Sequence, residues 1–392
     1  MSTHADLAVV GGGIAGASVA YELAATRSVV LLEAEATAGT HATARSAATW
    51  IPGHGVATAR ALVAASGPRF ALLAAELGGP PLLAPRPVLW VAADDRGEAA
   101  LAAQLAERAG EPDAAEPVDP DEARRRCPAL RDVRAAALVA AAADVDVDAL
   151  HRGYLRGLRA RGGTVRTGAR VVAARRAGTG WVVRLADGAE LPVGELVDAA
   201  GAWADVVAAR AGVPRIGLTP LRRTIAVARV PDPARLRAPD GGRLPMACEA
   251  ADRWYFKADG SSGTSGHLLV SPADETPAEP GDARPDEADV AVALERVEEV
   301  TGLGLRSVVT SWAGLRSFVP DRGPVVGAWP DHPGFWFVAG QGGSGIETAP
   351  ALAALAAAVV TGAPAPADVA VDPADLAPAR LAPAGLSAAA RS

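Results

Sequence analysis

The sequence predicts an α/β protein in which a domain on a parallel sheet is interleaved with a second domain on an antiparallel sheet. Two observations support this fold class. Near the N-terminus, continuous apolar stretches flank a glycine-rich turn and a helix, as in a parallel sheet that is covered on both faces. Further along the chain, short strands separated by turns indicate a second sheet. The 392 residues, half of them hydrophobic, can bury the cores of two such domains.

The first elements, in chain order, are a strand, a tight turn, a helix and a second strand. The turn contains Gly11, Gly13 and Gly16 in the spacing GxGxxG, and Glu33 ends the second strand. In a Rossmann-like domain the first glycine permits the turn, the second lets the backbone approach a pyrophosphate, and the third lets helix and strand pack closely. Amides at the helix N-terminus can then hold phosphate, and Glu33 can accept hydrogen bonds from ribose hydroxyls. The sequence therefore predicts a dinucleotide site at this turn.

The elements that follow alternate between helices and short strands. Apolar periodicity, capping residues and terminal glycines predict helices over 69–77, 94–110, 119–130, 148–163 and 288–302. Strands are predicted within 164–201 and over 224–230, 253–258, 267–272 and 334–340. The Pro- and acid-rich segment 271–287 is predicted to be an exposed loop, and the Ala- and Pro-rich tail from residue 364 is expected to end in disorder.

A second glycine-rich segment, AGQGGSGIETAP, covers residues 339–350. It leads into an alanine-rich stretch that should be helical. A helix that is entered through glycines commonly brings backbone amides to a ligand. Taken alone, however, the segment favours a glycine-rich turn ahead of a packing helix.

Four segments occur in an order and spacing that resemble the D-amino-acid oxidase superfamily of FAD-dependent amine oxidoreductases, which includes glycine oxidase, sarcosine oxidase and bacterial D-amino-acid dehydrogenases. They cover residues 9–35, 195–212, 311–327 and 334–353. Residues 39–50, 82–87, 148–159, 217–224 and 311–321 look more specifically like the FAD-dependent D-arginine dehydrogenases. The resemblance extends over nearly the whole chain and implies that one FAD accounts for both glycine clusters.

The resemblance implies a discontinuous FAD-binding domain and an interleaved substrate-binding domain. We expect residues 1–75, 145–217 and 315–370 in the FAD-binding domain, residues 76–144 and 218–314 in the substrate-binding domain, and a tail over 371–392. The FAD phosphates would lie at the first glycine cluster. The flavin ring would lie at the second, where amide dipoles of the helix N-terminus favour negative charge on the reduced ring.

The resemblance also implies which residues contact FAD. Residues 40–50 would cross the flavin, and Val171 would bring its backbone to the adenine. The cofactor-binding residues that we expect are Gly11, Gly13, Ile14, Ala15, Gly16, Glu33, Ala44, Arg45, Ser46, Ala47, Val171, Gly201, Gly314, Arg316, Gly342, Gly343, Ser344, Gly345 and Ile346. His41 lies where some superfamily members attach flavin covalently, but the relatives that share this pattern hold FAD non-covalently, and we expect the same here.

Arg316, within WAGLRSF, is the strongest candidate for a catalytic residue. Members of the superfamily use this arginine as a planar fork for the substrate carboxylate. Tyr255 matches a tyrosine that helps to bind the carboxylate, and Arg223 matches a second arginine near the site. Arg222, beside it, is the alternative counterpart of that second arginine. Gln341 flanks the glycine segment and could reach the substrate or the flavin.

The side-chain end of the site departs from the D-arginine dehydrogenase pattern. Val88 stands where a glutamate binds the guanidinium group of arginine, and Thr49 and His54 replace a histidine and a tyrosine. Met246 and Cys248 are expected on the same wall. This less acidic, more apolar pocket predicts a neutral or apolar substrate rather than D-arginine. His54 as a catalytic base is an alternative to the ordinary role of a hydrogen-bonded loop histidine.

The resemblance, together with the departures at the side-chain end, implies an FAD-dependent enzyme that deaminates a D-amino acid with a neutral or apolar side chain. Flavin N5 takes the α-hydrogen as hydride, and the imine is hydrolysed to a 2-oxo acid and ammonia. The alternatives are an oxidase of a secondary amine or a glycine-type substrate, including one in a specialised biosynthetic pathway, and a non-catalytic FAD subunit of a complex. Sarcosine oxidases use a lysine near the flavin for oxygen reduction. The matching strand here carries His267 instead, which favours a quinone or other carrier over O2 as electron acceptor.

Composition argues against several other classes. The net charge of −7 disfavours a nucleic-acid partner. Cys127 and Cys248 form no CxxC and the histidines show no ligand spacing, so we expect reduced thiols and no metal. The N-terminus lacks the basic segment of a signal peptide, and the apolar run 349–360 is too short to span a bilayer. We therefore expect a cytoplasmic protein whose partners are a small amine or amino acid and an electron acceptor.

Overall fold

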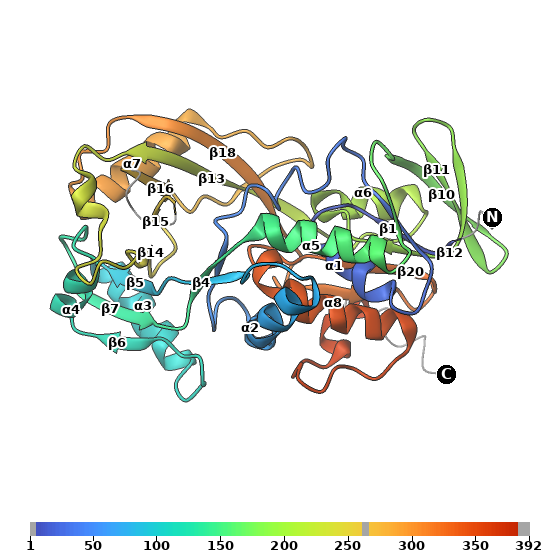
Figure 1. Ribbon diagram of the computed structural model, residues 1–392, viewed down its shortest axis with the longest axis horizontal. Coiled ribbons are helices and arrows are strands. Elements are labelled where there is room, and N and C mark those ends of the chain that lie inside the picture. The colour runs from blue at the N-terminus through green and yellow to red at the C-terminus, as the bar shows by residue number, and fades with distance from the viewer. Residues whose placement is uncertain (1–4, 261–265, 383–392) are drawn as a thin grey trace.

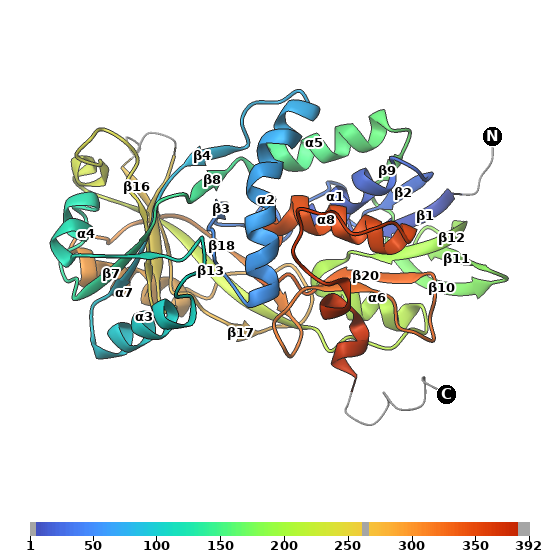
Figure 2. The ribbon, with the colours of Figure 1, turned by 90° about the horizontal axis from the view of Figure 1, so that it is seen from below.

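The computed structural model describes residues 5–260 and 266–382. Figure 1 shows two lobes along the longest axis, one around a mainly parallel sheet and the other around a mainly antiparallel sheet. Helix α2 (Ala57–Glu76) stands between the two lobes in Figure 2. The predicted fold class is therefore confirmed.

The first sheet runs in the order β10-β11-β12-β1-β2-β9, with β20 on β12 and β19 on β20. Strands β12, β1, β2, β9 and β20 pair in parallel, and the β10, β11 and β19 pairings are antiparallel. Its strands are β1 (Ala5–Val10), β2 (Val29–Leu32), β9 (Thr164–Arg166), β10 (Val171–Ala177), β11 (Gly180–Leu185), β12 (Glu190–Asp198), β19 (Val325–Gly327) and β20 (Phe335–Ala339).

Both faces of this sheet are buried, which explains the unbroken apolar sequence of its central strands. Leu7 and Val9 of β1 pack with helices α1 (Ile14–Leu23) and α8 (Gly345–Thr361) on one face. Ala8 and Val10 pack on the other face with α6 (Ala204–Arg210) and the β10–β11 hairpin. Successive residues of a strand point to opposite faces, so each must be apolar here. Helix α5 (Val147–Ala160) packs beside α1.

The second sheet runs in the order β17-β13-β16-β15-β14-β5-β7-β6, with β18 on the other edge of β13. Its strands are β5 (Val88–Ala92), β6 (Glu116–Val118), β7 (Ala135–Val139), β13 (Thr219–Arg229), β14 (Met246–Glu249), β15 (Tyr255–Ala258), β16 (His267–Ser271), β17 (Thr276–Pro277) and β18 (Val308–Phe318). All pairs are antiparallel except β5 with β14. Helices α3 (Asp95–Glu107), α4 (Pro120–Arg126) and α7 (Glu287–Thr301) pack against it.

A small third sheet and the chain end complete the described fold. The third sheet contains β3 (Thr49–Trp50), β4 (Leu83–Pro85) and β8 (Ala143–Val145). Residues 373–376 and 378–381 form 3₁₀ turns, the first of which buries Leu376 in the core under the parallel sheet. The disorder expected at the chain end falls on residues 383–392, outside the described residues. The division of the chain at the expected domain boundaries stays a prediction.

Helix α2 is longer than the sequence predicted. Only residues 69–77 were expected to be helical, yet the helix begins at Ala57 and continues through Gly67 and Pro68. A Cβ on Gly67 would lie 2.6 Å from Cζ2 of Trp50, so the glycine serves a close tertiary contact and does not mark a helix end. A single sequence cannot distinguish these two uses of glycine.

Candidate functional site

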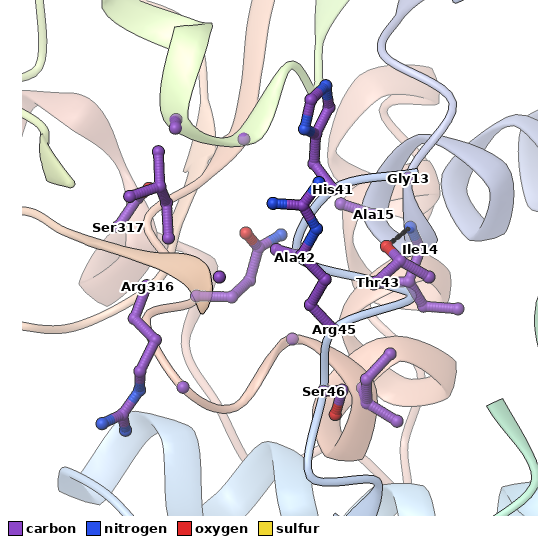
Figure 3. A pocket seen from close by; sticks show the side chains of 18 of the residues that line it. Gly13, Ile14, Ala15, His41, Ala42, Thr43, Arg45, Ser46, Arg316 and Ser317 are labelled. Atoms are coloured by element: carbon purple, nitrogen blue, oxygen red, sulfur yellow. Dashed lines mark hydrogen bonds between the residues drawn. The ribbon is translucent and has the colours of Figure 1, made fainter. Parts of the chain in front are cut away.

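A cavity of about 520 Å³ reaches from the carboxyl ends of β1 and β2 to strands β13–β15 of the second sheet. The carboxyl edge of a parallel sheet is the usual ligand site of α/β folds. Figure 3 shows the loop 41–46 between the start of α1, at residues 13–15, and the strand that carries Arg316 and Ser317. The two glycine clusters therefore meet in one cavity.

Most residues predicted from the sequence line this cavity. They are Gly11, Gly13, Ile14, Ala15, Glu33, Arg45, Ser46, Ala47, Thr49, His54, Val171, Gly201, Arg223, Met246, Cys248, Tyr255, Gly314, Arg316, Gln341, Gly342, Gly343, Gly345 and Ile346. The predicted residues Gly16, Ala44, Val88 and Ser344 are not among the lining residues.

Gly11 and Gly16 are required by packing in the first turn. Gly11 has φ +105°, and a Cβ there would lie 2.5 Å from the carbonyl oxygen of Ala199. A Cβ on Gly16 would lie 1.8 Å from the carbonyl oxygen of Gly11. Gly16 thus lets the helix approach the turn, as its place in GxGxxG predicted, and does not itself face the cavity.

Side chains hold the first glycine-rich turn in shape. The Glu33 carboxylate accepts a hydrogen bond from the Gly12 amide at 2.7 Å, and the Thr43 hydroxyl accepts one from the Ile14 amide at 2.9 Å (Figure 3). His151 Nε2 donates to the Gly12 carbonyl at 2.8 Å, and burial lowers the pKa of His151 below 6.5. The sequence did not single out Gly12, Thr43 or His151, although all three lie in segments that carry the family resemblance.

Strand β18 crosses the second glycine cluster at contact distance. Gly342 donates its amide to the Ser317 carbonyl at 3.0 Å. A Cβ on Gly342 would lie 2.1 Å from the ring of Phe318, and a Cβ on Gly343 would lie 1.9 Å from Nη2 of Arg316. Glycine at position 342, which has φ +55°, is therefore required by the Phe318 ring and the backbone conformation, whereas a side chain at position 343 would displace the Arg316 guanidinium group.

Polar atoms in the cavity fit the FAD that the sequence implies. Among the described residues that line the cavity, three have a buried atom without a hydrogen-bond partner: His41 Nδ1, Gln341 Nε2 and Ser317 Oγ. Buried polar groups without partners are costly, so these atoms indicate a polar ligand. The amides at the start of α1 suit a pyrophosphate, Glu33 suits ribose hydroxyls, and the start of α8 suits the polar edge of a flavin.

Two guanidinium groups meet at the cavity wall. Nη1 of Arg316 and Nη2 of Arg223 lie 3.5 Å and 3.4 Å from Oε1 of Glu275. Burial lowers the pKa of Arg316 to about 10, and Arg223 adds to this shift, so that Arg316 is still protonated at neutral pH. Arg222 instead binds Asp289 of α7 at 2.7 Å. Of the two candidate arginines, only Arg223 lines the cavity.

The apolar end of the cavity is formed by β13, β14 and β15. Met246, Cys248 and Tyr255 line it, and burial raises the pKa of the Cys248 thiol, so this cysteine is uncharged. Val88 is fully buried beside Met246 on the neighbouring strand and does not line the cavity, so its assignment to the pocket is wrong. Two residues further along β5, Trp90 reaches the cavity instead. The predicted segment was right and the residue within it was not.

His54 is held by a buried carboxylate that the sequence did not single out. Its Nδ1 lies 2.7 Å from Oε1 of Glu347, and Oε2 of Glu347 accepts the Ile51 amide at 3.0 Å. Glu347 is in the first turn of α8 and lines the cavity. The His54 ring also stacks on Trp90, with centroids 6.5 Å apart. The signal that was missed is the position of Glu347 immediately after the second glycine cluster.

The segment 271–287 is not simply an exposed loop, because Gly281 and Ala283 line the cavity. Arg45 fastens it there: its Nη1 donates to the carbonyls of Ala283 at 2.8 Å and Ala313 at 3.0 Å, and its Nη2 binds Asp282 at 2.5 Å. Arg45, which the sequence predicted as a cofactor contact, thus ties the segment 271–287 to the loop that contains residues 41–46.

A buried ion cluster supports the cavity wall behind Thr49. Lys257, the only lysine of the chain, has its Nζ 3.4 Å from the Thr49 hydroxyl and 2.8 Å from Asp144. Asp144 also binds Arg86 Nε at 2.7 Å and Arg243 Nη1 at 3.0 Å. Burial raises the pKa of Asp144, but Lys257 and Arg86 outweigh burial, and the pKa lies below 3.8. The single carboxylate of Asp144 therefore partly neutralises the charges of three cationic side chains.

Two absences bear on the class of site. Across residues 5–260 and 266–382, no group of three or more His, Cys, Asp or Glu side chains is arranged to hold a metal ion. In the same described residues, no helix has both the length and the hydropathy that crossing a bilayer requires.

Sequence comparisons extend the family resemblance. Residues 6–359 match the family model described as FAD dependent oxidoreductase. Over 119 residues, 29% of this chain, the sequence is 36% identical to glycine oxidase of Pseudomonas putida strain KT2440. That match spans only 30% of the length of the curated relative.

Solved structures share the fold over almost the whole chain. L-proline dehydrogenase from P. horikoshii has a TM-score of 0.82 at 19% identity, with 96% of this chain and 97% of that chain covered. Glycine oxidase from Geobacillus kaustophilus has a TM-score of 0.81 at 22% identity, with 95% and 98% covered. At these identities the likeness establishes the fold.

We predict that Asp144→Asn destabilises the protein at neutral pH by about 3–5 kcal/mol, because it leaves buried cations without their carboxylate. Since the pKa of Asp144 is lowered in the folded state, its contribution is present above pH 3.8 and is lost as the pH falls through the folded value. Urea unfolding at pH 7 and pH 3 measures both effects: the gap between variant and parent should narrow at pH 3.

Asp148→Asn is the matched control, because Asp148 forms an exposed ion pair with Arg152. This control should unfold close to the parent at both pH values. The role of Asp144 as counter-ion would be contradicted if Asp144→Asn and the parent had equal free energies of unfolding at pH 7, or if their difference were the same at pH 3 as at pH 7.

Proposed function

We propose that this chain, which belongs to the family of FAD-dependent oxidoreductases, catalyses the oxidative deamination of a D-amino acid with a neutral or apolar side chain. Bound FAD supplies the two-electron acceptor for the α-hydrogen, and the imine is hydrolysed to a 2-oxo acid and ammonia. The D configuration rests on the resemblance of residues 39–50 and 217–224 to D-arginine dehydrogenases. The observation that carries the proposal is the pair of guanidinium groups, Arg223 and Arg316, on the wall of the FAD cavity.

Arg316 and Arg223 are the proposed grip on the substrate carboxylate. Two planar guanidinium groups can each donate paired hydrogen bonds to a carboxylate, which fixes its orientation as well as its position. Tyr255 lines the same part of the cavity, and its hydroxyl is a third candidate donor. Arg316 touches the glycine cluster at Gly343, so a carboxylate bound there would place the α-carbon beside the proposed flavin position.

The far end of the cavity supports a neutral or apolar side chain. Met246, Cys248, Ile225 and Trp90 line it. Asp252 also lines the cavity, but its Oδ2 lies 3.4 Å from Arg223 Nη2, so a substrate cation would compete with Arg223 for this carboxylate. Glu249 is fully buried and binds Arg253. A guanidinium side chain would therefore be desolvated without a dedicated carboxylate.

We assign to His54 the proton that leaves the substrate ammonium group. Because a carboxylate only accepts, the contact with Glu347 keeps a proton on Nδ1 and leaves Nε2 of the neutral ring as the basic atom. A neutral amine results, and its nitrogen lone pair assists loss of the α-hydrogen. The family alternative, an amine that binds unprotonated, would need no such base.

We propose that FAD is held without a covalent bond. His41, the candidate for attachment, has its Nε2 3.3 Å from Glu35 and its ring 4.8 Å from that of Trp203. Its Nδ1, however, is buried without a hydrogen-bond partner, so the proposal of a non-covalent FAD rests on the resemblance to relatives that hold FAD in this way. The buried, uncharged thiol of Cys248 is also poorly suited to attack a flavin.

Two alternatives differ in substrate or role. A secondary-amine or glycine-type oxidase would use the same carboxylate grip with a smaller substrate. A non-catalytic FAD subunit would need no such grip, so the presence of Arg223 and Arg316 on the cavity wall argues against it. The electron acceptor stays open between O2, a quinone and another carrier.

We predict that Arg316→Ala retains FAD but loses most amine oxidation, because the carboxylate is no longer held. A loss of about a thousandfold in kcat/KM corresponds to roughly 4 kcal/mol of transition-state binding. Arg316→Lys should recover only part of it, since an ammonium group lacks the planar fork. Steady-state rates are the measurement, and acid precipitation should release the flavin from parent and variants alike. Undiminished turnover of an amino acid by Arg316→Ala would refute the carboxylate role.

We predict that D-arginine is a poorer substrate than D-leucine, D-methionine or D-phenylalanine, because the apolar end offers no free carboxylate. The ratio of kcat/KM values should favour the apolar substrates by about tenfold or more. Glycine, sarcosine and proline belong in the same panel, since a preference for one of them would move the assignment to the secondary-amine or glycine-type alternative. A preference for D-arginine would show that Asp252 or another acid serves its side chain.

We predict that His54→Ala lowers kcat/KM by about 100-fold, within the range for loss of a general base. Added imidazole should restore part of the rate, because it can enter the space left beside Glu347. His332→Ala, on a turn away from the cavity lining, is the control and should match the parent. A His54→Ala variant with parental rates, or one that imidazole does not rescue, would leave His54 as a hydrogen-bonded structural residue.

A further inference from the structure

One carboxylate, that of Glu275, is shared by three guanidinium groups beside the cavity. Its Oε1 lies 2.8 Å from Nη2 of Arg322, 3.4 Å from Nη2 of Arg223 and 3.5 Å from Nη1 of Arg316. Glu275 does not line the cavity, whereas Arg223 and Arg316 do. Glu275 therefore contacts the arginine pair from outside the cavity and leaves the inner side of the pair open to a ligand.

A second carboxylate, that of Asp252, contacts the guanidinium group of Arg223 from the cavity side. Asp252 lines the cavity, and its Oδ2 lies 3.4 Å from Nη2 of Arg223. The nearby carboxylate of Asp274 is engaged elsewhere, because it accepts from the amide and hydroxyl of Thr224 and pairs with Arg222. Three guanidinium groups against two carboxylates leave the cluster one net positive charge.

We propose that Glu275 is a specificity-determining positioning residue: it holds Arg223 and Arg316 together and, with Asp252, leaves them enough charge for one carboxylate, so that the site selects monocarboxylic over dicarboxylic ligands. This inference rests on the proposed function, because it takes the arginine pair as the carboxylate site. It adds the substrate class and assigns a role to a residue outside the cavity.

The cavity wall next to the arginine pair offers little to a second carboxylate. The other arginines that line the cavity, Arg45, Arg170 and Arg210, contact Asp282, Glu35 and the Val171 carbonyl. The wall that follows the arginine pair is formed by Tyr255, Met246 and Cys248. Lys257 lies behind Thr49, but its ammonium group is bound to Asp144 and is not among the lining residues. A second substrate anion would thus be desolvated close to Asp252 without a cation of its own.

Succinamate and succinate test the proposal in the FAD-loaded enzyme, because they differ only by an amide in place of one carboxylate. Calorimetric titration gives a Kd for each. We expect the parent to bind succinamate at least about tenfold more tightly than succinate. Glu275→Gln removes one negative charge near the arginine pair. It should lower the ratio of the succinate Kd to the succinamate Kd by about tenfold, on the scale of one partly screened charge at close range.

Two further variants keep the test sharp. Asp252→Asn removes the other carboxylate and should shift the ratio in the same direction; Asp252 has φ +53°, a conformation that asparagine adopts readily. Glu279→Gln removes an exposed charge from the same loop and should leave the ratio unchanged.

The outcomes distinguish failure of the proposed carboxylate site at Arg316 from failure of the proposed role of Glu275. If Arg316→Ala binds succinamate as well as the parent does, the carboxylate site is elsewhere, and both the proposed function and this inference fall. If Arg316→Ala loses succinamate but Glu275→Gln and Asp252→Asn leave the ratio unchanged, only this inference falls. A parent enzyme that prefers succinate overturns it as well, and would point to the cations behind Thr49.

Discussion

The contact between Arg316 and Gly343 is the constraint that joins the two lobes at the site. Arg316 belongs to β18 of the antiparallel sheet, and Gly343 lies between β20 and α8 of the parallel lobe. A side chain at residue 343 would overlap the guanidinium group, since its Cβ would lie 1.9 Å from Nη2. The Gly342 amide is bonded to the Ser317 carbonyl in the same place. The backbone hydrogen bond and the close packing of the Arg316 guanidinium group on Gly343 therefore position the proposed substrate grip against the proposed flavin contact.

Burying two arginines side by side creates the second constraint. Like charges in a low-dielectric wall repel, and each loses hydration, so the pair needs carboxylates nearby. Glu275 meets that need from the segment 271–287, and Arg45 ties the same segment over the cavity through Asp282 and Ala283. A stretch whose composition is that of a surface loop thus supplies both a counter-ion and a cover. Its chemistry becomes apparent only once its neighbours are known.

What the sequence could predict follows from how local each signal is. The GxGxxG turn, Glu33 and the glycine segment before α8 are continuous patterns with a physical reason for each position, and the structure brings all of them into one cavity. Glu275 and Asp252 act through partners far along the chain, so no local pattern marks them. Val88 shows an intermediate case: it shares one face of β5 with Trp90, but it is buried beside Met246, and Trp90, two residues further along, lines the cavity.

Glu347 brings a carboxylate to the N-terminus of α8, where it is hydrogen-bonded to His54. The N-terminus of α8 carries partial positive charge, which favours negative charge on a group bound there. An uncompensated carboxylate in the first turn would cancel that benefit, because it brings a full negative charge to the same place. Here its two oxygens are taken by His54 Nδ1 and the Ile51 amide, on the side of β3. These hydrogen bonds stabilise the carboxylate but leave its negative charge, which opposes part of the positive potential of the helix end. Its structural effect is to orient the histidine that lines the cavity.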